Sequence, residues 1–284
     1  MKNIIKTILV HFSYLISLIK WFLIAILREN FKCYFLRDSK GKELRILANG
    51  SALSSVDVSD SYEDIDYCML NNSCLTTMFW DVKPSLFVLA DPAYFIDDYK
   101  NEMVNKTLCA LGDVSWSMTL CVPFQYRKSI QLYVKNNRKI SLKYYHTNPY
   151  WGWRNLSMLL YKHNFSMPSS QNVLVPCIYI GILKGYSAIK LYGANHSWTE
   201  NLTVNNENRV CIRDVHFYDS GEVKSTPWKK ITGTYYKMHE ILSDLSLTFA
   251  AYHNLKTFAD YMHVKVINMT PNSYIDAFER GGDA

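Results

Sequence analysis

Short apolar runs alternate with longer amphipathic stretches along most of the chain after residue 40. The short runs predict strands at residues 44–48, 67–70, 86–90, 118–122, 140–144, 188–192 and 264–268. The longer stretches predict helices near residues 73–80, 94–111, 171–183 and 238–262, and a last helix after residue 273. Strands that alternate with helices indicate the α/β class, with a mostly parallel sheet and crossover helices. Residues 195–237 break the alternation, and we expect this segment, called the lid segment below, to be an insertion or lid.

A nearly continuous apolar run covers residues 4–27. At 100° per residue its polar positions fall on one narrow stripe: Lys2, Lys6, Ser13, Ser17, Lys20 and Arg28. This pattern favours a helix that lies at an anionic membrane surface. A membrane-spanning helix and a helix packed on its own domain stay open as alternatives. A cleaved signal peptide fits poorly, because no small-x-small site follows the run.

The formal net charge of +6 belongs to the N-terminus. Residues 1–45 hold nine basic and three acidic groups of the 31 and 25 in the chain, which leaves 22 of each in residues 46–284. A body without a basic surplus is not expected to bind nucleic acid. We therefore divide the chain into residues 1–40, a membrane helix and bridge, and residues 41–284, a catalytic domain.

The seven cysteines are odd in number and form no C-x-x-C pair. Several lie inside apolar runs, where cysteine behaves as a small hydrophobic residue. We expect neither a disulfide framework nor a zinc site, and a reducing cytoplasm is the simpler location.

Polar residues cluster where the predicted strands end. In a parallel sheet, ligands bind beyond these carboxyl ends. The candidates are Asn49, Gly50 and Ser51 after the first strand, Asn71 and Asn72 after the second, Asp91 after the third, and Asn195 with His196 after the sixth. Asparagine both donates and accepts hydrogen bonds, which suits a neutral base or sugar edge, and Ser51 can cap a helix whose amino end favours phosphate. Each residue alone is also a common turn former.

Two common nucleotide-binding motifs are missing from the sequence: there is no G-x-x-x-x-G-K-[ST] and no G-x-G-x-x-G. Asp64 and Asp66 spell the D-x-D of metal-dependent glycosyltransferases, but they precede the predicted strand. We interpret them as a solvated strand entry and expect no metal ligands.

The lid segment carries the histidine that we expect to act as a base. His216 lies between Asp214 and Asp219, and a neighbouring carboxylate can orient an imidazole and raise its basicity. His196 and His239 rank behind it. A surface-loop histidine without a role stays open as the alternative.

Four motifs in order resemble those of bacterial sialyltransferases of the lipooligosaccharide type. Residues 45–54 (RILANGSALS) resemble the family's opening "hhGNGPSL", and residues 84–95 (PSLFVLADPAYF) resemble the segment that carries its Asn-Pro. Residues 185–193 (GYSAIKLYG) resemble its "GYKEIYLSG" strand, and residues 264–273 (VKVINMTPNS) resemble its closing strand and "CPNS" turn.

This resemblance implies a single Rossmann-like domain with a lid that transfers an acidic sugar, such as sialic acid or Kdo, from a CMP donor without metal or other cofactor. By the same resemblance, Asn49 and Asn71 or Asn72 hold the donor, the turn of Pro271, Asn272 and Ser273 helps to hold the nucleotide, and Gln171 and Asn172 face the donor. A lid histidine, here His216, is the base. The family's "GIDFY" is replaced by residues 193–198 (GANHSW), so Tyr218 is our candidate for the tyrosine that assists the leaving phosphate.

The expected partners are a CMP-activated sugar, a lipid-linked or cell-surface glycan acceptor and an anionic membrane surface contacted by residues 1–30. They place the protein at the cytoplasmic face of the bacterial inner membrane, in lipopolysaccharide or capsule biosynthesis. Self-association into a homo-oligomer is left open. The alternatives are a pterin diphosphokinase-like α/β transferase, which would need a metal and ATP, and a non-catalytic scaffold of polysaccharide assembly.

Overall fold

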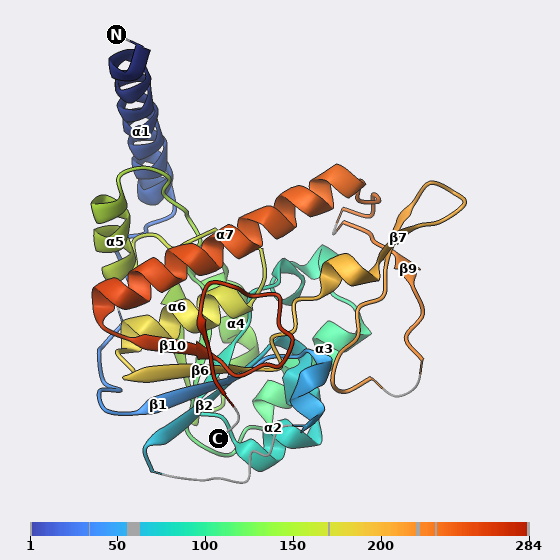
Figure 1. The fold of residues 1–284 in the computed structure, drawn as a ribbon. Helices are drawn as coiled ribbons and strands as arrows, with labels where there is room; N and C mark the ends of the chain where they lie inside the picture. Colours follow the sequence, from blue (N-terminus) through green and yellow to red (C-terminus); the bar gives the residue numbers. More distant parts are fainter. Residues whose placement is uncertain are drawn as a thin grey trace.

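A computed structural model describes residues 2–33, 35–55, 63–169, 171–219, 222–230 and 232–282. Its centre is an eight-stranded sheet in which every neighbouring pair is parallel, in the order β11-β10-β6-β1-β2-β3-β4-β5 (Figure 1). The strands are β1 (Glu43–Leu47), β2 (Ile65–Leu70), β3 (Leu86–Val88), β4 (Met118–Pro123), β5 (Ile140–Tyr145), β6 (Ala188–Tyr192), β10 (Lys265–Asn268) and β11 (Glu279–Arg280). The α/β class and the mostly parallel sheet are thus confirmed.

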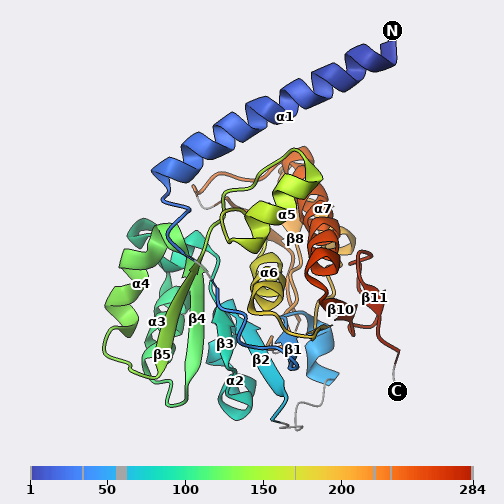
Figure 2. The same ribbon diagram turned by 90° about the vertical axis from the view of Figure 1, so that its left-hand side faces the viewer.

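One face of the sheet is covered by α5 (Arg154–Lys162), α6 (Leu174–Lys184) and α7 (Met238–Met262), as Figure 2 shows. Alternate strand residues such as Leu44, Ile46 and Cys68 point into this layer and are fully buried with α6. Every described residue of α6 from Leu174 to Leu183 is buried. A helix that is apolar all round belongs in the interior, so α6 fixes the middle of the sheet.

The opposite face is covered by α2 (Thr77–Val82), α3 (Glu102–Gly112) and α4 (Arg127–Val134). The intervening strand residues, such as Leu47, Met69 and Phe87, pack here. Two buried faces explain why the strands read as continuous apolar runs rather than as alternating ones.

The helix predicted at residues 94–111 begins later than expected, because it is preceded by the 3₁₀ turns η3 (Pro92–Tyr94) and η4 (Asp97–Tyr99). The Asn101 side chain accepts a hydrogen bond from Val104 N and caps α3 at that point. The helix predicted after residue 273 is wrong: the described residues there form turns and then β11. Helices α4 and α5 were not predicted.

The lid segment contains η6 (Trp198–Asn201) and an antiparallel sheet of β7 (Leu202–Val204), β8 (Val210–Ile212) and β9 (Thr226–Pro227). Val210 packs against Ile241 and Leu245 of α7. The small sheet therefore lies beside the amino end of α7 (Figure 1).

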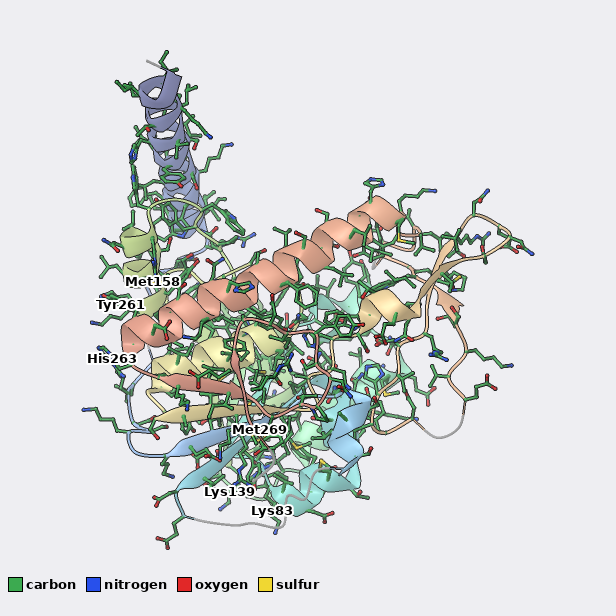
Figure 3. All side chains as sticks on the ribbon, viewed as in Figure 1. Lys83, Lys139, Met158, Tyr261, His263 and Met269 are labelled. Carbon is green, nitrogen blue, oxygen red and sulfur yellow. The ribbon has the colours of Figure 1, made fainter. Side chains whose placement is uncertain are left out.

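The N-terminal helix α1 (Lys2–Leu27) projects from the body (Figures 1 and 2). The stretch Ile4–Leu27 is long and apolar enough to cross a membrane, and only 11% of its most apolar window is buried. Trp21 and Ala25 near its carboxyl end pack against Tyr150 and Leu160, whereas most other side chains of α1 stand free (Figure 3). The alternative of a helix packed on its own domain is therefore not what the structure shows.

Candidate functional site

A polar cavity of 390 Å³ opens at the carboxyl ends of β1, β2 and β6, between the sheet, the amino end of α6 and the lid segment. The sequence-predicted residues that line it are Asn49, Gly50, Ser51, Asn71, Asn172, Asn195, His196 and His216. Residues more than 160 positions apart in the chain are thus brought to one site by the parallel order of the strands.

Asn49 lies two residues beyond the end of β1, and Asn71 directly follows the last residue of β2. The Oδ1 atom of each is buried and has no hydrogen-bond partner among the described residues. A buried amide oxygen without a partner is costly unless something supplies a donor. A hydroxyl or amino group of a bound nucleoside or sugar can supply it here.

Gly50 and Gly193 let two turns pack directly on each other. A Cβ atom on Gly50 would collide with Gly193 O and with Asn195 Oδ1, which accepts a hydrogen bond from Ala52 N at 3.2 Å. Gly193 has a φ of 66°, in the left-handed region that favours glycine. The Asn195 side chain therefore borders the cavity while its oxygen holds the Gly50–Ala52 turn.

Asn172 organises the amino end of α6 at the cavity wall. Its Oδ1 accepts from Leu174 N at 2.8 Å and from Val175 N at 3.2 Å, and its Nδ2 donates to Tyr252 Oη. The positive end of an eleven-residue helix thus borders the cavity, which favours an anionic group there.

His216 reaches the cavity because the lid segment is hydrogen-bonded to the first strand's turn. Phe217 N donates to Asn49 O at 3.0 Å, and His216 forms an isolated β-bridge with Gly50. The imidazole lies between two carboxylates: its Nε2 is 3.7 Å from Asp214 Oδ2 and its Nδ1 is 3.6 Å from Asp219 Oδ2. Carboxylates in these positions can stabilise the imidazolium that forms when His216 takes up a proton.

Tyr218 supports the histidine and is not among the residues that line the cavity. Its ring stacks on the His216 ring with centroids 5.0 Å apart and planes at 10°. Burial, together with the nearby Asp219 and Asp214, raises the Tyr218 pKa to about 12. The hydroxyl therefore stays protonated at neutral pH.

His196 lines the same cavity but is held differently. Its Nε2 lies 2.5 Å from Tyr252 Oη, and its ring contacts the Trp198 ring at 4.2 Å between centroids. Burial lowers the His196 pKa to about 3. Its Nε2 is already engaged by Tyr252 and burial opposes the charged imidazole, so we favour His216, between its two carboxylates, for the role of the base.

Several predicted residues lie outside the cavity. Asn72 Oδ1 accepts from Tyr94 Oη and Thr107 Oγ1, so Asn71, not Asn72, borders the site. Asp91 caps η3 through Ala93 N. His239 lies exposed in the first turn of α7, and Gln171 lines a neighbouring cavity. The element after Gly50 is the short 3₁₀ turn η1 (Ser51–Ser55) and not an α-helix, so the expected phosphate site at its amino end has little helix dipole behind it.

The turn of Pro271, Asn272 and Ser273 braces the site from behind. Pro271 and Asn272 are exposed, whereas Ser273 is buried and its Oγ donates to Ala194 O at 2.5 Å. Tyr274 N also donates to Asn195 O. None of the three turn residues lines the cavity, so this turn acts by holding the residues that do.

Sequence reasoning missed Arg213 and Trp198, which also line the cavity. Arg213 donates to Asn201 Oδ1 at 3.1 Å, and no other Lys or Arg lines the cavity within the described ranges. Arg213 directly precedes Asp214 and lies three residues before His216, and this proximity was the signal available in the sequence.

The described part of the chain contains no group of three or more His, Cys, Asp or Glu residues that could hold a metal ion. Asp66 lies near the amino end of β2, at the edge of the sheet opposite the cavity, where it contacts Tyr186 Oη at 2.7 Å and Lys42 Nζ at 3.4 Å. All seven cysteines are free.

The fold and the site together define an α/β protein with a ligand cavity at the carboxyl edge of a parallel sheet. No family model matches the chain, and no curated protein matches it. Among solved structures the chain is similar to the sialyltransferase CstII from Campylobacter jejuni in complex with the substrate analogue CMP-3FNeuAc, with 14% identity, a TM-score of 0.45, and coverage of 84% of this chain and 85% of that one. It is likewise similar to the complex of CstII with cytidine-5'-monophosphate, with 13% identity, a TM-score of 0.45 and 84% of both chains covered. The function proposed below rests on the cavity and the sequence motifs and not on this degree of likeness.

Proposed function

We propose that the protein is a glycosyltransferase that moves an acidic sugar from a CMP donor to a hydroxyl group of a glycan, with inversion and without a metal ion. The observation that carries the proposal is that one cavity is lined by Asn49 and Asn71, whose buried Oδ1 atoms have no partner among the described residues, and by a histidine flanked by carboxylates. The order of the four sequence motifs supports the sugar-nucleotide donor class.

The reaction would begin with His216 taking the proton of the acceptor hydroxyl. The resulting oxygen attacks the anomeric carbon from the face opposite the phosphate, forming the new C–O bond as the bond to CMP breaks. Asp214 and Asp219 stabilise the protonated His216. The electron pair leaves with the phosphate oxygen, whose charge meets the amino end of α6 and the Arg213 guanidinium.

We further propose that α1 holds this enzyme at the cytoplasmic face of a bacterial inner membrane, where a lipid-linked glycan of lipopolysaccharide or capsule synthesis is the acceptor. The polar residues Ser13, Ser17 and Lys20 line a groove between α1 and residues 148–151 of the body. The exposed side chains elsewhere on the helix are mainly large and apolar. An apolar surface of this length fits a lipid environment better than water.

Calorimetric titration with CMP, with UMP as the matched control, tests the donor class. We expect CMP to bind and Asn49→Ala and Asn71→Ala to weaken it, because each substitution removes an amide from the cavity wall. Asn72→Ala is the control for position, since its amide faces Tyr94 and Thr107. No binding at millimolar CMP would refute the transferase and leave the scaffold alternative.

Hydrolysis of CMP-sialic acid, CMP-Kdo and related donors then identifies the sugar. We expect turnover to survive EDTA. Activity that requires ATP and a divalent cation would instead support the diphosphokinase alternative.

A further inference from the structure

A second cavity of 260 Å³ adjoins the first on the side of the lid segment and α7. Trp198, Asp214 and Asn172 border both cavities. The other walls come from β9's end and the first turns of α7. Its volume is below the roughly 300–1,000 Å³ of sites for drug-sized ligands, which suits one sugar ring and not a longer chain.

Aromatic side chains form much of its wall. Trp198, Trp228 and Tyr236 line it, and the Trp228 and Tyr236 rings lie 5.7 Å apart at 58°. The two rings pack against the buried side chains Val210, Ile241 and Leu245. Rigid aromatic faces offer a large contact area to an apolar C–H face at low entropic cost.

Carboxylates supply the polar part of the same wall. Asp214 and Asp244 line the cavity, and no Lys or Arg does so within the described segments. The nearby Lys230 is paired with Glu240 at 2.5 Å. The Asp244 carboxylate has no hydrogen bond or ion pair among the described residues, so it is available to accept hydroxyl groups.

We infer that this second cavity is the subsite for the terminal sugar of the acceptor, and that it selects a neutral ring over an acidic one. The inference rests on the proposed transferase function. Aromatic faces would contact the C–H face of the ring, and Asp214 and Asp244 would accept its hydroxyls. An acceptor ending in a carboxylated sugar would instead place a third negative charge beside Asp214 and Asp244, where the described residues put no Lys or Arg on the wall.

The position of Asp214 links the subsite to the chemistry. This residue lines the second cavity and also lies 3.7 Å from His216 Nε2. A hydroxyl held near Asp214 is therefore presented toward the proposed base. The reaction would then add an acidic sugar to a neutral end, and its product would no longer fit the subsite, which limits the enzyme to a single addition.

Competition between two acceptors tests the inference: one ends in a neutral hexose, and the other is the same glycan already capped by sialic acid. We expect kcat/KM to favour the neutral acceptor by at least about tenfold. Asp244→Asn keeps the shape and removes one charge, so it should narrow that preference. Asp260→Asn is the matched control, because this carboxylate lies on the same helix and is paired with Lys256.

Substitutions of the aromatic wall give an independent measurement. Trp228→Ala should raise the KM for the acceptor by about tenfold, while Trp228→Phe should retain most of the binding. Donor hydrolysis without acceptor should be unchanged in all of these variants. Equal or better use of the sialylated acceptor, or variants that alter donor hydrolysis alone, would overturn the subsite.

A protein that fails to hydrolyse any CMP donor would refute the proposed function, and the subsite is then judged by binding alone. Titration of tryptophan fluorescence with methyl galactoside against methyl sialoside compares a neutral and an acidic ring directly. Quenching by the neutral ring supports the subsite if it is lost in Trp228→Phe, because that variant removes the reporting indole of the wall while it retains the aromatic contact. No response to either ring, or a stronger response to the acidic one, refutes it.

Discussion

At the residue scale, the two histidines of the cavity show how surroundings divide roles between identical side chains. His216 lies between two carboxylates on a loop, whereas His196 is buried against Tyr252 and Trp198. A base must gain a proton during the reaction, and carboxylates favour that charge while burial opposes it. His196 is therefore better suited to hold its neighbours in place.

His216→Ala should lower kcat by about 10²–10⁴-fold, the range that a general base contributes. The Kd for CMP should be unchanged, because His216 contacts the acceptor side of the cavity in our mechanism. Initial-rate transfer assays measure kcat, and calorimetry measures the Kd for CMP. His239→Ala is the control, since this histidine in the first turn of α7 is exposed and does not line the cavity; a comparable loss there, or full activity in His216→Ala, would contradict the assignment.

A second prediction concerns stability and pH. Burial and the nearby Arg127 lower the pKa of His146 from 6.5 to about 4. The unfolded chain takes up a proton near pH 6.5 that the folded chain refuses until about pH 4. The stability that His146 contributes is therefore fully present above pH 6.5. The free energy of unfolding falls as the pH drops from 6.5 toward 4, because protonation of His146 then favours the unfolded chain.

His146→Phe removes this titration, and a phenyl ring can keep the packing on Phe124, whose ring lies 4.9 Å from the imidazole. As the pH drops from 6.5 to 5, we expect the free energy of unfolding to fall by about 2 kcal/mol less in the variant than in the parent. Denaturant unfolding at the two pH values measures the difference. His163→Phe, at an exposed position, should leave the pH dependence as it is; identical slopes for His146→Phe and the parent would contradict the prediction.

The same scale shows where sequence reasoning ends. Asn71 and Asn72 are chemically identical neighbours, and the sequence left both as donor residues. The choice depends on where β2 ends and η2 (Asn71–Leu75) begins, which turns the Asn72 amide toward Thr107 of α3. Contacts between distant segments decide this, and no local pattern carries them.

At the element scale, the strands were predicted well because both faces of the sheet are buried and each strand is a short apolar run between turn residues. Helices α4 and α5 were missed because their polar faces interrupt the apolar pattern, with Ile130 and Val134 as the buried residues of α4. The last predicted helix failed because Asn268 and Arg280 hydrogen-bond into the 270–275 turn and hold it open. Side chains from both ends of the segment thus replace the helical hydrogen bonds.

The turn of residues 271–273 gives the element-scale prediction. Ser273 Oγ donates to Ala194 O and accepts from Asn268 Nδ2 and Ile275 N, so Ser273→Ala removes three hydrogen bonds in a buried turn. We expect a loss of about 1–3 kcal/mol in the free energy of unfolding and weaker CMP binding. Asn272→Gly is the matched variant: Asn272 is exposed with a φ of 53°, which glycine adopts freely, so stability and CMP binding should be retained. Weaker CMP binding in Asn272→Gly at unchanged stability would show that the turn contacts the nucleotide itself.

At the scale of the whole molecule, the charge and the apolar surface both concentrate in the first 45 residues, while the neutral body carries the cavity. The body contacts α1 near its carboxyl end, through Trp21 and Ala25 on Tyr150 and Leu160, and near its middle, through His11 Nδ1, which accepts from Trp153 Nε1 at 3.0 Å. The body and the helix are thus joined at a defined place, which would fix how the cavity faces a membrane.

Removal of residues 2–10 shortens the free apolar part of α1 and keeps His11, Trp21 and Ala25 in place. We expect the intact protein to sediment with anionic phosphatidylglycerol vesicles and the shortened protein to stay largely in solution, with CMP binding unchanged in both. Lys6→Glu with Lys20→Glu distinguishes the two membrane arrangements. A helix on the surface should lose its preference for anionic over neutral phosphatidylcholine vesicles, since each lysine contributes about 1 kcal/mol there. A spanning helix should resist carbonate extraction from either lipid, and a shortened protein that still sediments would show that the body itself binds the membrane.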